Sequence, residues 1–323
     1  LLSLPVAKKQ QDMQTAVLFL IFNRPDTASQ VFEAIRRARP PRLYVAADGP
    51  RKERPGEAEL CRRTREIVNG VDWECEVHTL FRDENLGCGR AVSGAIGWFF
   101  SQEPEGIVLE DDCLPHPDFF PYCEELLARY RDDRRVAFIS GNNFDFGTPD
   151  RRTSYYFSAY SHVWGWAAWR RSWELYDFSL AGKTLPEFRA VLRDLFLTPT
   201  ERRHWENIFM KMKLGKIDTW DYQFSISLMS AGALCIIPAV PLIRNIGFTP
   251  DATHTTQEDL RLSQRLTGPI LPLVHPDRVE QDKEADRRYM HDYLRRRISL
   301  LHHLKRKAFY ALARARKREG RTQ

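Results

Sequence analysis

Long apolar runs are missing from this 323-residue sequence: stretches such as 16–22 are far shorter than the roughly 20 residues that a membrane-spanning helix needs. The opening residues, LLSLPVAKKQ, place their apolar side chains before their lysines, which reverses the order found in a secretory signal. The sequence therefore predicts neither a spanning helix nor a signal peptide in these segments, and we expect a cytoplasmic protein.

Cysteine is sparse and unpatterned. The six cysteines show neither paired spacing nor the close pairs of a zinc knuckle. A secreted scaffold held by disulfides would be shorter and denser in cysteine, so we expect free thiols in a reducing compartment. Internal repeats and low-complexity segments are also absent.

A glycine-rich dinucleotide loop is absent as well. The segment NLGCGRAVSG (85–94) comes late in the chain, and its glycines do not fit the spacing G-x-G-x-x-G. This argues against a Rossmann cofactor site. The glycines instead predict a turn that leads a helix, and Arg90 on it, toward a nucleotide.

The net charge of +6 is unevenly distributed. Residues 284–323 hold 13 Lys and Arg against 4 Asp and Glu, so the other 283 residues carry a balance of −3. A protein that reads nucleic acid is expected to carry positive charge across its working face. The near-neutral body therefore argues against nucleic acid as a partner.

Short apolar strands alternate with helical stretches through the first half. The predicted strands cover 16–22, 42–47, 75–81, 106–110 and 136–140, and the predicted helices include 57–68, 89–100 and 118–130. This alternation predicts an α/β fold with a mostly parallel central sheet flanked by helices. In such sheets, ligands gather at the carboxyl ends of the strands.

The second half has a different character. Aromatic residues crowd into 154–173, and a helix at 220–230 and a strand at 233–238 are predicted further on. From 284 the sequence predicts a basic amphipathic helix. The aromatic side chains can stack on sugars or belong to the core, and both remain open for Tyr156, Tyr160, Trp164 and Trp166.

The strongest chemical signal is Glu110-Asp111-Asp112, directly after a predicted buried strand. Adjacent carboxylates repel one another unless a cation offsets them. Mg²⁺ and Mn²⁺ take oxygen ligands and often share a site with a diphosphate. The alternative is an acidic solvated loop that caps the next helix.

Two further residues follow predicted strands, Arg24 after the first and Asp48 after the second. Both are expected at the same rim as the acidic cluster. A carboxylate can accept the imide N–H of uracil, and Arg can hold a base or phosphate. The alternatives are a surface turn at Asp48 and a structural Arg where a helix begins.

Acidic residues also flank a tryptophan in Asp218-Thr219-Trp220-Asp221. Asp221 can act as a general base on an acceptor hydroxyl, while Asp218 suits a helix N-cap. His254, in a Thr-rich loop, can complete a metal site, touch a diphosphate or lie on the surface.

Together these segments resemble GT-A glycosyltransferases, and most closely the N-acetylglucosaminyltransferase I family and its bacterial relatives. The likeness covers about residues 16–255 and rests on IFNRPD (21–26), the Asp48-Gly49 turn, NLGCGRAVSGAI (85–96), LEDDCLPHPDFFPYCEELL (109–127), GWAAW (165–169), TWDYQF (219–224) and 244–255. It implies the GT-A fold and one domain with a nucleotide-sugar-binding half (16–150) and an acceptor-binding half (151–283). Residues 1–15 form an N-terminal extension, and 284–323 form a basic helical tail outside the likeness.

The resemblance also implies roles. Asp112 would ligate the metal, with Glu110 and Asp111 near the ribose and sugar and Arg24 and Asp48 on the nucleotide. Asp221 matches the region of the catalytic base, although the family has two adjacent acids there and this chain has Asp-Tyr. His254 would lie in a loop that closes over the donor.

The implied enzyme is an inverting glycosyltransferase that uses Mn²⁺ or Mg²⁺ and a UDP-sugar donor, acting in bacterial surface polysaccharide or glycan assembly. Its acceptor would be a glycan or a lipid-linked sugar, and the basic tail (284–323) can bind the inner face of an anionic membrane or pack on the body. Two rivals are a sugar-nucleotide pyrophosphorylase and a non-catalytic binding module on the same fold. A pyrophosphorylase would carry a glycine-rich phosphate loop after the first strand. The segment NRPDTA (23–28), which follows that strand here, lacks such a loop.

Overall fold

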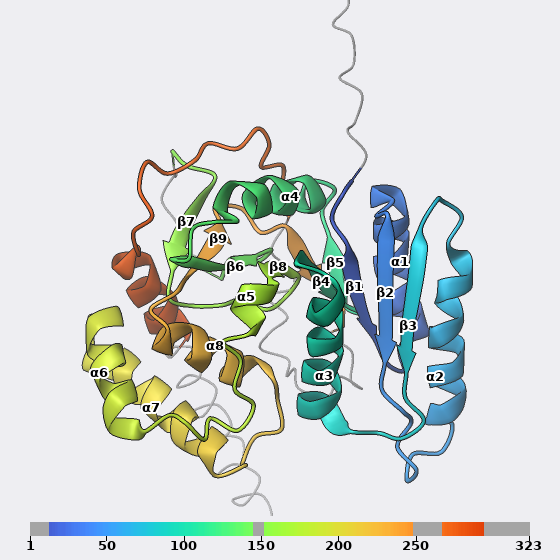
Figure 1. Ribbon diagram of the computed structural model, residues 1–323, viewed down its shortest axis with the longest axis horizontal. Coiled ribbons are helices and arrows are strands. Elements are labelled where there is room, and N and C mark those ends of the chain that lie inside the picture. Colours follow the sequence, from blue (N-terminus) through green and yellow to red (C-terminus); the bar gives the residue numbers. More distant parts are fainter. Residues whose placement is uncertain (1–12, 145–151, 248–266, 294–323) are drawn as a thin grey trace, which may run out of the picture.

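The computed structural model describes residues 13–144, 152–247 and 267–293. Within them, one eight-stranded sheet has the order β3-β2-β1-β4-β8-β6-β9-β7 (Figure 1). Its strands are β1 (Val17–Ile21), β2 (Arg42–Ala47), β3 (Glu76–Phe81), β4 (Glu105–Glu110), β6 (Val136–Ser140), β7 (Tyr155–Ser158), β8 (Trp166–Trp169) and β9 (Leu234–Pro238). Only β8 and β7 run against the other strands. The predicted α/β fold with a mostly parallel sheet is confirmed.

A second, two-stranded sheet pairs β5 (Cys113–Pro115) with β10 (Ile243–Asn245). It matters because β5 follows the acidic cluster within the chain. The Ile246 N–H donates to the Asp112 carbonyl at 2.8 Å. The segment after β10 is therefore held against Asp112.

Helices cover both faces of the large sheet. They are α1 (Pro25–Ala38), α2 (Glu57–Arg65), the 3₁₀ turn η1 (Glu66–Gly70), α3 (Gly87–Gln102), α4 (Phe119–Tyr130), α5 (Arg170–Trp173), α6 (Leu185–Leu195), α7 (Pro199–Lys213) and α8 (Asp221–Ser230). Alternate side chains of each strand point to opposite faces. Phe19 of β1 accordingly belongs to the core cluster that includes residues of α1 and α4, whereas Leu20 belongs to the cluster that includes residues of α3 and α8.

A third core cluster lies between α6, α7, α8 and a helical segment at 283–293. In that last segment Ala285, Asp286 and Met290 are buried. The first turns of the predicted basic tail therefore pack on the body. The rest of the tail, 294–323, lies outside the described residues. None of the described helices is both long enough and apolar enough to span a bilayer.

Candidate active site

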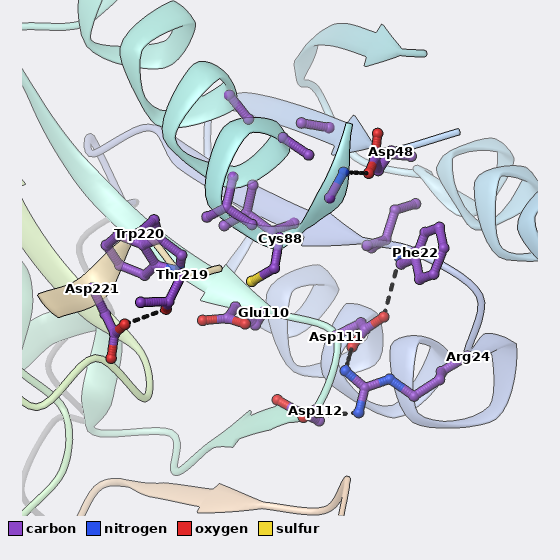
Figure 2. A pocket seen from close by; sticks show the side chains of 18 of the residues that line it. Phe22, Arg24, Asp48, Cys88, Glu110, Asp111, Asp112, Thr219, Trp220 and Asp221 are labelled. Atoms are coloured by element: carbon purple, nitrogen blue, oxygen red, sulfur yellow. Dashed lines mark hydrogen bonds and ion pairs between the residues drawn. The ribbon is translucent and has the colours of Figure 1, made fainter. Parts of the chain in front are cut away.

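A cavity of about 590 Å³ opens where β1, β2 and β4 end. One side is formed by residues at the end of these strands or directly after it, namely Phe22, Asp48 and the run 110–112. The other side comes from the second half of the chain and includes Trp164 and 218–221. Figure 2 shows Glu110, Asp112 and Asp221 around this space. The rim predicted from the strand ends thus brings together residues that are far apart in sequence.

Arg24 joins two members of the acidic cluster. It follows β1, and Pro25 then begins α1 with the φ angle that a first helical turn requires. The Arg24 guanidinium lies 2.5 Å from the Asp111 carboxylate and 2.9 Å from that of Asp112. Asp111 also accepts the Phe22 N–H at 3.1 Å. Arg24 thus supplies positive charge to the acidic cluster, as Figure 2 shows.

The cluster is nevertheless short of positive charge. Burial raises the pKa of Glu110, and the neighbouring Asp112 and Asp111 carboxylates raise it further. Burial also raises the pKa of Asp111, although Arg24 opposes this. One guanidinium does not offset three carboxylates, so the remaining negative charge is left to be met by protons or by a further cation.

Within the acidic cluster, Asp112 is the residue that could hold a divalent cation, with a substrate supplying other ligands. The described residues contain no group of three or more His, Cys, Asp or Glu side chains that could hold a metal ion alone. One Asp112 oxygen pairs with Arg24, and within the described residues the other accepts a weak thiol contact from Cys113 at 3.4 Å. Mg²⁺ sites often use one or two carboxylates plus phosphates and water.

Asp48 lines the cavity, but its carboxylate is engaged by the start of α3. It accepts the backbone N–H of Leu86 at 3.0 Å and that of Gly87 at 3.1 Å, and the Asn85 side-chain amide at 3.0 Å. Carboxylates stabilise helix N-termini in this way. Asp48 thereby fixes the position of α3, and its contact with a base stays a prediction.

Arg90 is not among the residues that line the cavity. Its side chain is exposed, and its guanidinium lies over the Phe178 ring, 5.5 Å from the centroid. The reason is helical phase, because the cavity-facing side of α3 carries Cys88, Ala91 and Ala95 instead. The glycine-permitted turn was predicted correctly, but it directs Arg90 away from the cavity.

Asp218 and Asp221 both line the cavity, with different partners. Asp218 was predicted to suit an N-cap, and this is wrong: α8 begins at Asp221 and its N-cap position is Trp220. The Asp218 carboxylate instead accepts the Gly89 N–H of α3 at 3.1 Å. The Thr219 hydroxyl donates to the Asp221 carboxylate. His254 lies outside the described residues.

Several cavity residues were missed by the sequence argument. Arg51 and Arg82 line the cavity close to the ends of β2 and β3, as does Asn245 at the end of β10. The rule that ligands gather at strand ends could have found them. Arg51 is engaged by Glu57, whose carboxylate also accepts the Asn23 side chain.

The aromatic cluster divides between core and cavity. Tyr156, Tyr160 and Trp166 are buried, and Trp166 is 0% exposed. Trp164 is partly exposed and lines the cavity. Stacking on a sugar is therefore confined to Trp164 among these four residues.

No family model and no curated protein sequence matches this chain. Among solved structures, it is similar to TarS from S. aureus at 10% identity and a TM-score of 0.37, covering 70% of this chain. The match spans 58% of that TarS chain. Mouse xyloside xylosyltransferase 1 matches at 9% identity and a TM-score of 0.35, over 69% of this chain and 84% of that one. A UDP-glucose pyrophosphorylase matches at 9% identity and a TM-score of 0.35, over 70% and 90%. Likenesses this distant assign neither a family nor an activity.

Proposed function

We propose that this chain is an inverting glycosyltransferase of the GT-A type that transfers a sugar from a UDP-sugar to an acceptor hydroxyl. The observation that carries the proposal is the pairing of two acidic groups across one cavity. Glu110, Asp111 and Asp112 stand at the end of β4, and Asp221 stands opposite at the start of α8. The resemblance to the N-acetylglucosaminyltransferase I family adds the assignment of roles.

On the donor side, residues 16–150 would hold the nucleotide. Arg24 and the nearby Arg51 and Arg82 offer guanidinium groups of the kind that bind phosphates and bases. Asp112 would hold a Mn²⁺ or Mg²⁺ ion together with the diphosphate, and such an ion supplies Lewis-acid stabilisation to a departing diphosphate. Glu110 would face the sugar.

On the acceptor side, residues 151–283 would place the acceptor hydroxyl beside Asp221. Asp221 takes the proton of that hydroxyl as its oxygen attacks the anomeric carbon from the face opposite the diphosphate. The bond to the acceptor forms as the bond to UDP breaks, so one displacement inverts the anomeric configuration. Trp164 offers an aromatic face to the sugar.

The basic tail is the feature from which we infer the class of acceptor. We propose a glycan or lipid-linked acceptor, with residues 294–323 meeting an anionic membrane surface. Because residues 283–293 pack on the body, the tail would begin from a fixed place on the protein. Tyr289, an apolar residue of the predicted tail helix, packs against the third core cluster and so belongs to the body.

The test is a calorimetric titration of UDP into metal-free protein, with and without Mn²⁺. The native protein and Asp112→Ala are compared, and Glu84→Ala serves as a control because Glu84 is an exposed carboxylate that pairs with the exposed Lys52. We expect Mn²⁺-dependent binding in the native protein and the control, and none in Asp112→Ala.

Absence of UDP binding under every condition would overturn the uridine assignment. Equal binding by native protein and Asp112→Ala would overturn the metal site. A panel of UDP-sugars offered with pyrophosphate separates the main rival, because a pyrophosphorylase would release UTP whereas a transferase releases UDP.

A further inference from the structure

The loop that precedes Asp221 is fastened to α3 at a single acidic residue. The Asp218 carboxylate accepts the Gly89 N–H at 3.1 Å, and Gly89 lies in the first turn of α3. Asp218 is exposed to solvent on its remaining side. A helix that contributes to the nucleotide side of the cavity is thus joined to the loop that carries the proposed base.

Two glycines make this junction possible. A Cβ atom on Gly87 would lie 2.8 Å from the Asp218 carboxylate, and one on Gly89 would lie 2.6 Å from it. The Gly89 Cβ would also come within 2.9 Å of the Thr219 carbonyl oxygen. Gly87 additionally has φ of +80°, a conformation that residues with side chains rarely adopt. Any larger residue at Gly89 would push the loop away from α3.

Further contacts link this loop to Asp221 and to the core. The Thr219 carbonyl accepts the Gln223 side-chain amide at 2.6 Å. Trp220 is 3% exposed and stacks on Trp166, with ring centroids 5.8 Å apart. The Thr219 hydroxyl then donates to Asp221. These contacts connect the segment at Asp218 to the Asp221 carboxylate three residues further along the chain.

From this geometry we infer that Asp218 is a positioning residue that clasps the base-bearing loop to the glycine turn of α3, and that Asp221 alone is the base. The inference rests on the proposed function and deepens it, because it separates the roles of two acids in one cavity. The clasp needs a hydrogen-bond acceptor at 218 but no ionisable group.

The experiment compares four variants: Asp218→Asn, Asp218→Ala, Gly89→Ala and Gly97→Ala. Asp218→Asn keeps an oxygen that can accept the Gly89 N–H, and Asp218→Ala does not. Gly97 lies on the same helix, but a Cβ there meets nothing closer than Trp173 at 3.4 Å, so it is the matched control. The readouts are UDP affinity by calorimetry and kcat for UDP release from a UDP-sugar with water as acceptor.

We expect Asp218→Ala and Gly89→Ala to lower kcat by about tenfold to a hundredfold, since small misplacements of catalytic groups have effects of this size. UDP affinity should change little. Asp218→Asn should keep most of the native kcat, and Gly97→Ala should match the native protein. An Asp218→Asn variant as inactive as Asp218→Ala would overturn the inference, because a base cannot be replaced by an amide. Equal effects of Gly89→Ala and Gly97→Ala would overturn it too.

A second readout separates this inference from the proposed function. If the native protein neither binds nor releases UDP, the proposed function fails, and hydrogen exchange of the amides of 217–222 decides about the clasp. Faster exchange in Asp218→Ala and Gly89→Ala than in Asp218→Asn and Gly97→Ala supports it. Identical exchange in all four variants refutes it.

Discussion

Asp111 and Asp286 are both buried, at 3% and 1% exposure, yet the surroundings of the two carboxylates differ. Asp111, at the cavity, pairs with the Arg24 guanidinium and accepts one backbone N–H. Asp286, in the helical segment 283–293, accepts the Ala159 N–H at 3.0 Å, the Gln281 amide at 2.7 Å and the Ser158 hydroxyl. Within the described residues, no cation forms an ion pair with Asp286.

The comparison shows that the free-energy cost of burying a carboxylate is offset by a charged partner at Asp111 and by neutral donors at Asp286. A charged partner can be shared with an incoming ion or phosphate, so the Asp111 site can respond to a ligand. Neutral donors that are fixed in the backbone and core offer no such exchange. The Asp286 network therefore suits a permanent junction, which here joins the start of the basic tail to β7.

The largest expected effect is that of Arg24→Gln. Removing this cation leaves the buried Asp111 and the partly buried Asp112 without their counter-charge. We expect a loss of about 3 kcal/mol in the free energy of unfolding at pH 8, the lower end of the range for breaking a buried pair, because the Arg24 side chain is 31% exposed. Urea denaturation measures it. Arg42→Gln is the control, because Glu103 keeps the Tyr44 hydroxyl as a donor. An equal loss of unfolding free energy in Arg42→Gln would show that the ion pairs of Arg24 contribute no more to stability than that of Arg42.

Asp286→Ala should have a somewhat smaller effect. It leaves three donors without an acceptor, and we expect a loss of about 2–3 kcal/mol, since each unsatisfied buried donor costs about 1–3 kcal/mol and some can find water. The exposed Glu284→Ala variant, which breaks an i,i+3 pair with Arg287, should lose less than about 0.5 kcal/mol. A thermal unfolding series checks both. Matching losses in the two variants would show that the buried network contributes nothing.

The smallest expected effect is a change with pH in the free energy of unfolding. Burial raises the pKa of Asp286 to about 7 from its ordinary value of 3.8, although its three hydrogen bonds oppose this. The folded chain therefore binds this proton more tightly than the unfolded chain. The contribution of the group is complete below pH 4 and is lost as the pH rises through 7. Relative to Asp286→Asn, the native protein should gain on the order of 1–2 kcal/mol between pH 8 and pH 6. A constant difference across that range contradicts the raised pKa.

Continuous apolar strands were the part of the fold that sequence could predict. The strands at 42–47 and 136–140 have the predicted bounds, because an unbroken apolar run between polar residues marks a strand buried on both faces. The strands β7 and β8 were missed, since both lie inside one aromatic stretch in which nothing marks their ends. The bounds of elements in that stretch depend on pairing with β9 and β4.

Helices α6 and α7 were missed although a local signal existed. Each begins with a capping box, Thr184 with Glu187 and Thr198 with Glu201, and each has a proline in its first turn. At the site, the strand ends placed Arg24 and the acidic cluster at one rim. Their ion pairs, and the partner of Asp218 on α3, depend on distances between segments that the sequence does not contain.

At Gly247 the backbone passes so close to Asp112 and Arg24 that the side chains allowed at these three positions depend on one another. A Cβ on Gly247 would lie 2.4 Å from the Asp112 carboxylate and 2.6 Å from the Arg24 guanidinium. A substitution at any one of these residues changes what the other two can be, which is epistasis between side chains in contact. A side chain at position 247 is therefore expected to be accepted only together with a smaller residue at 24 or 112, so that a screen of position 247 alone would return glycine.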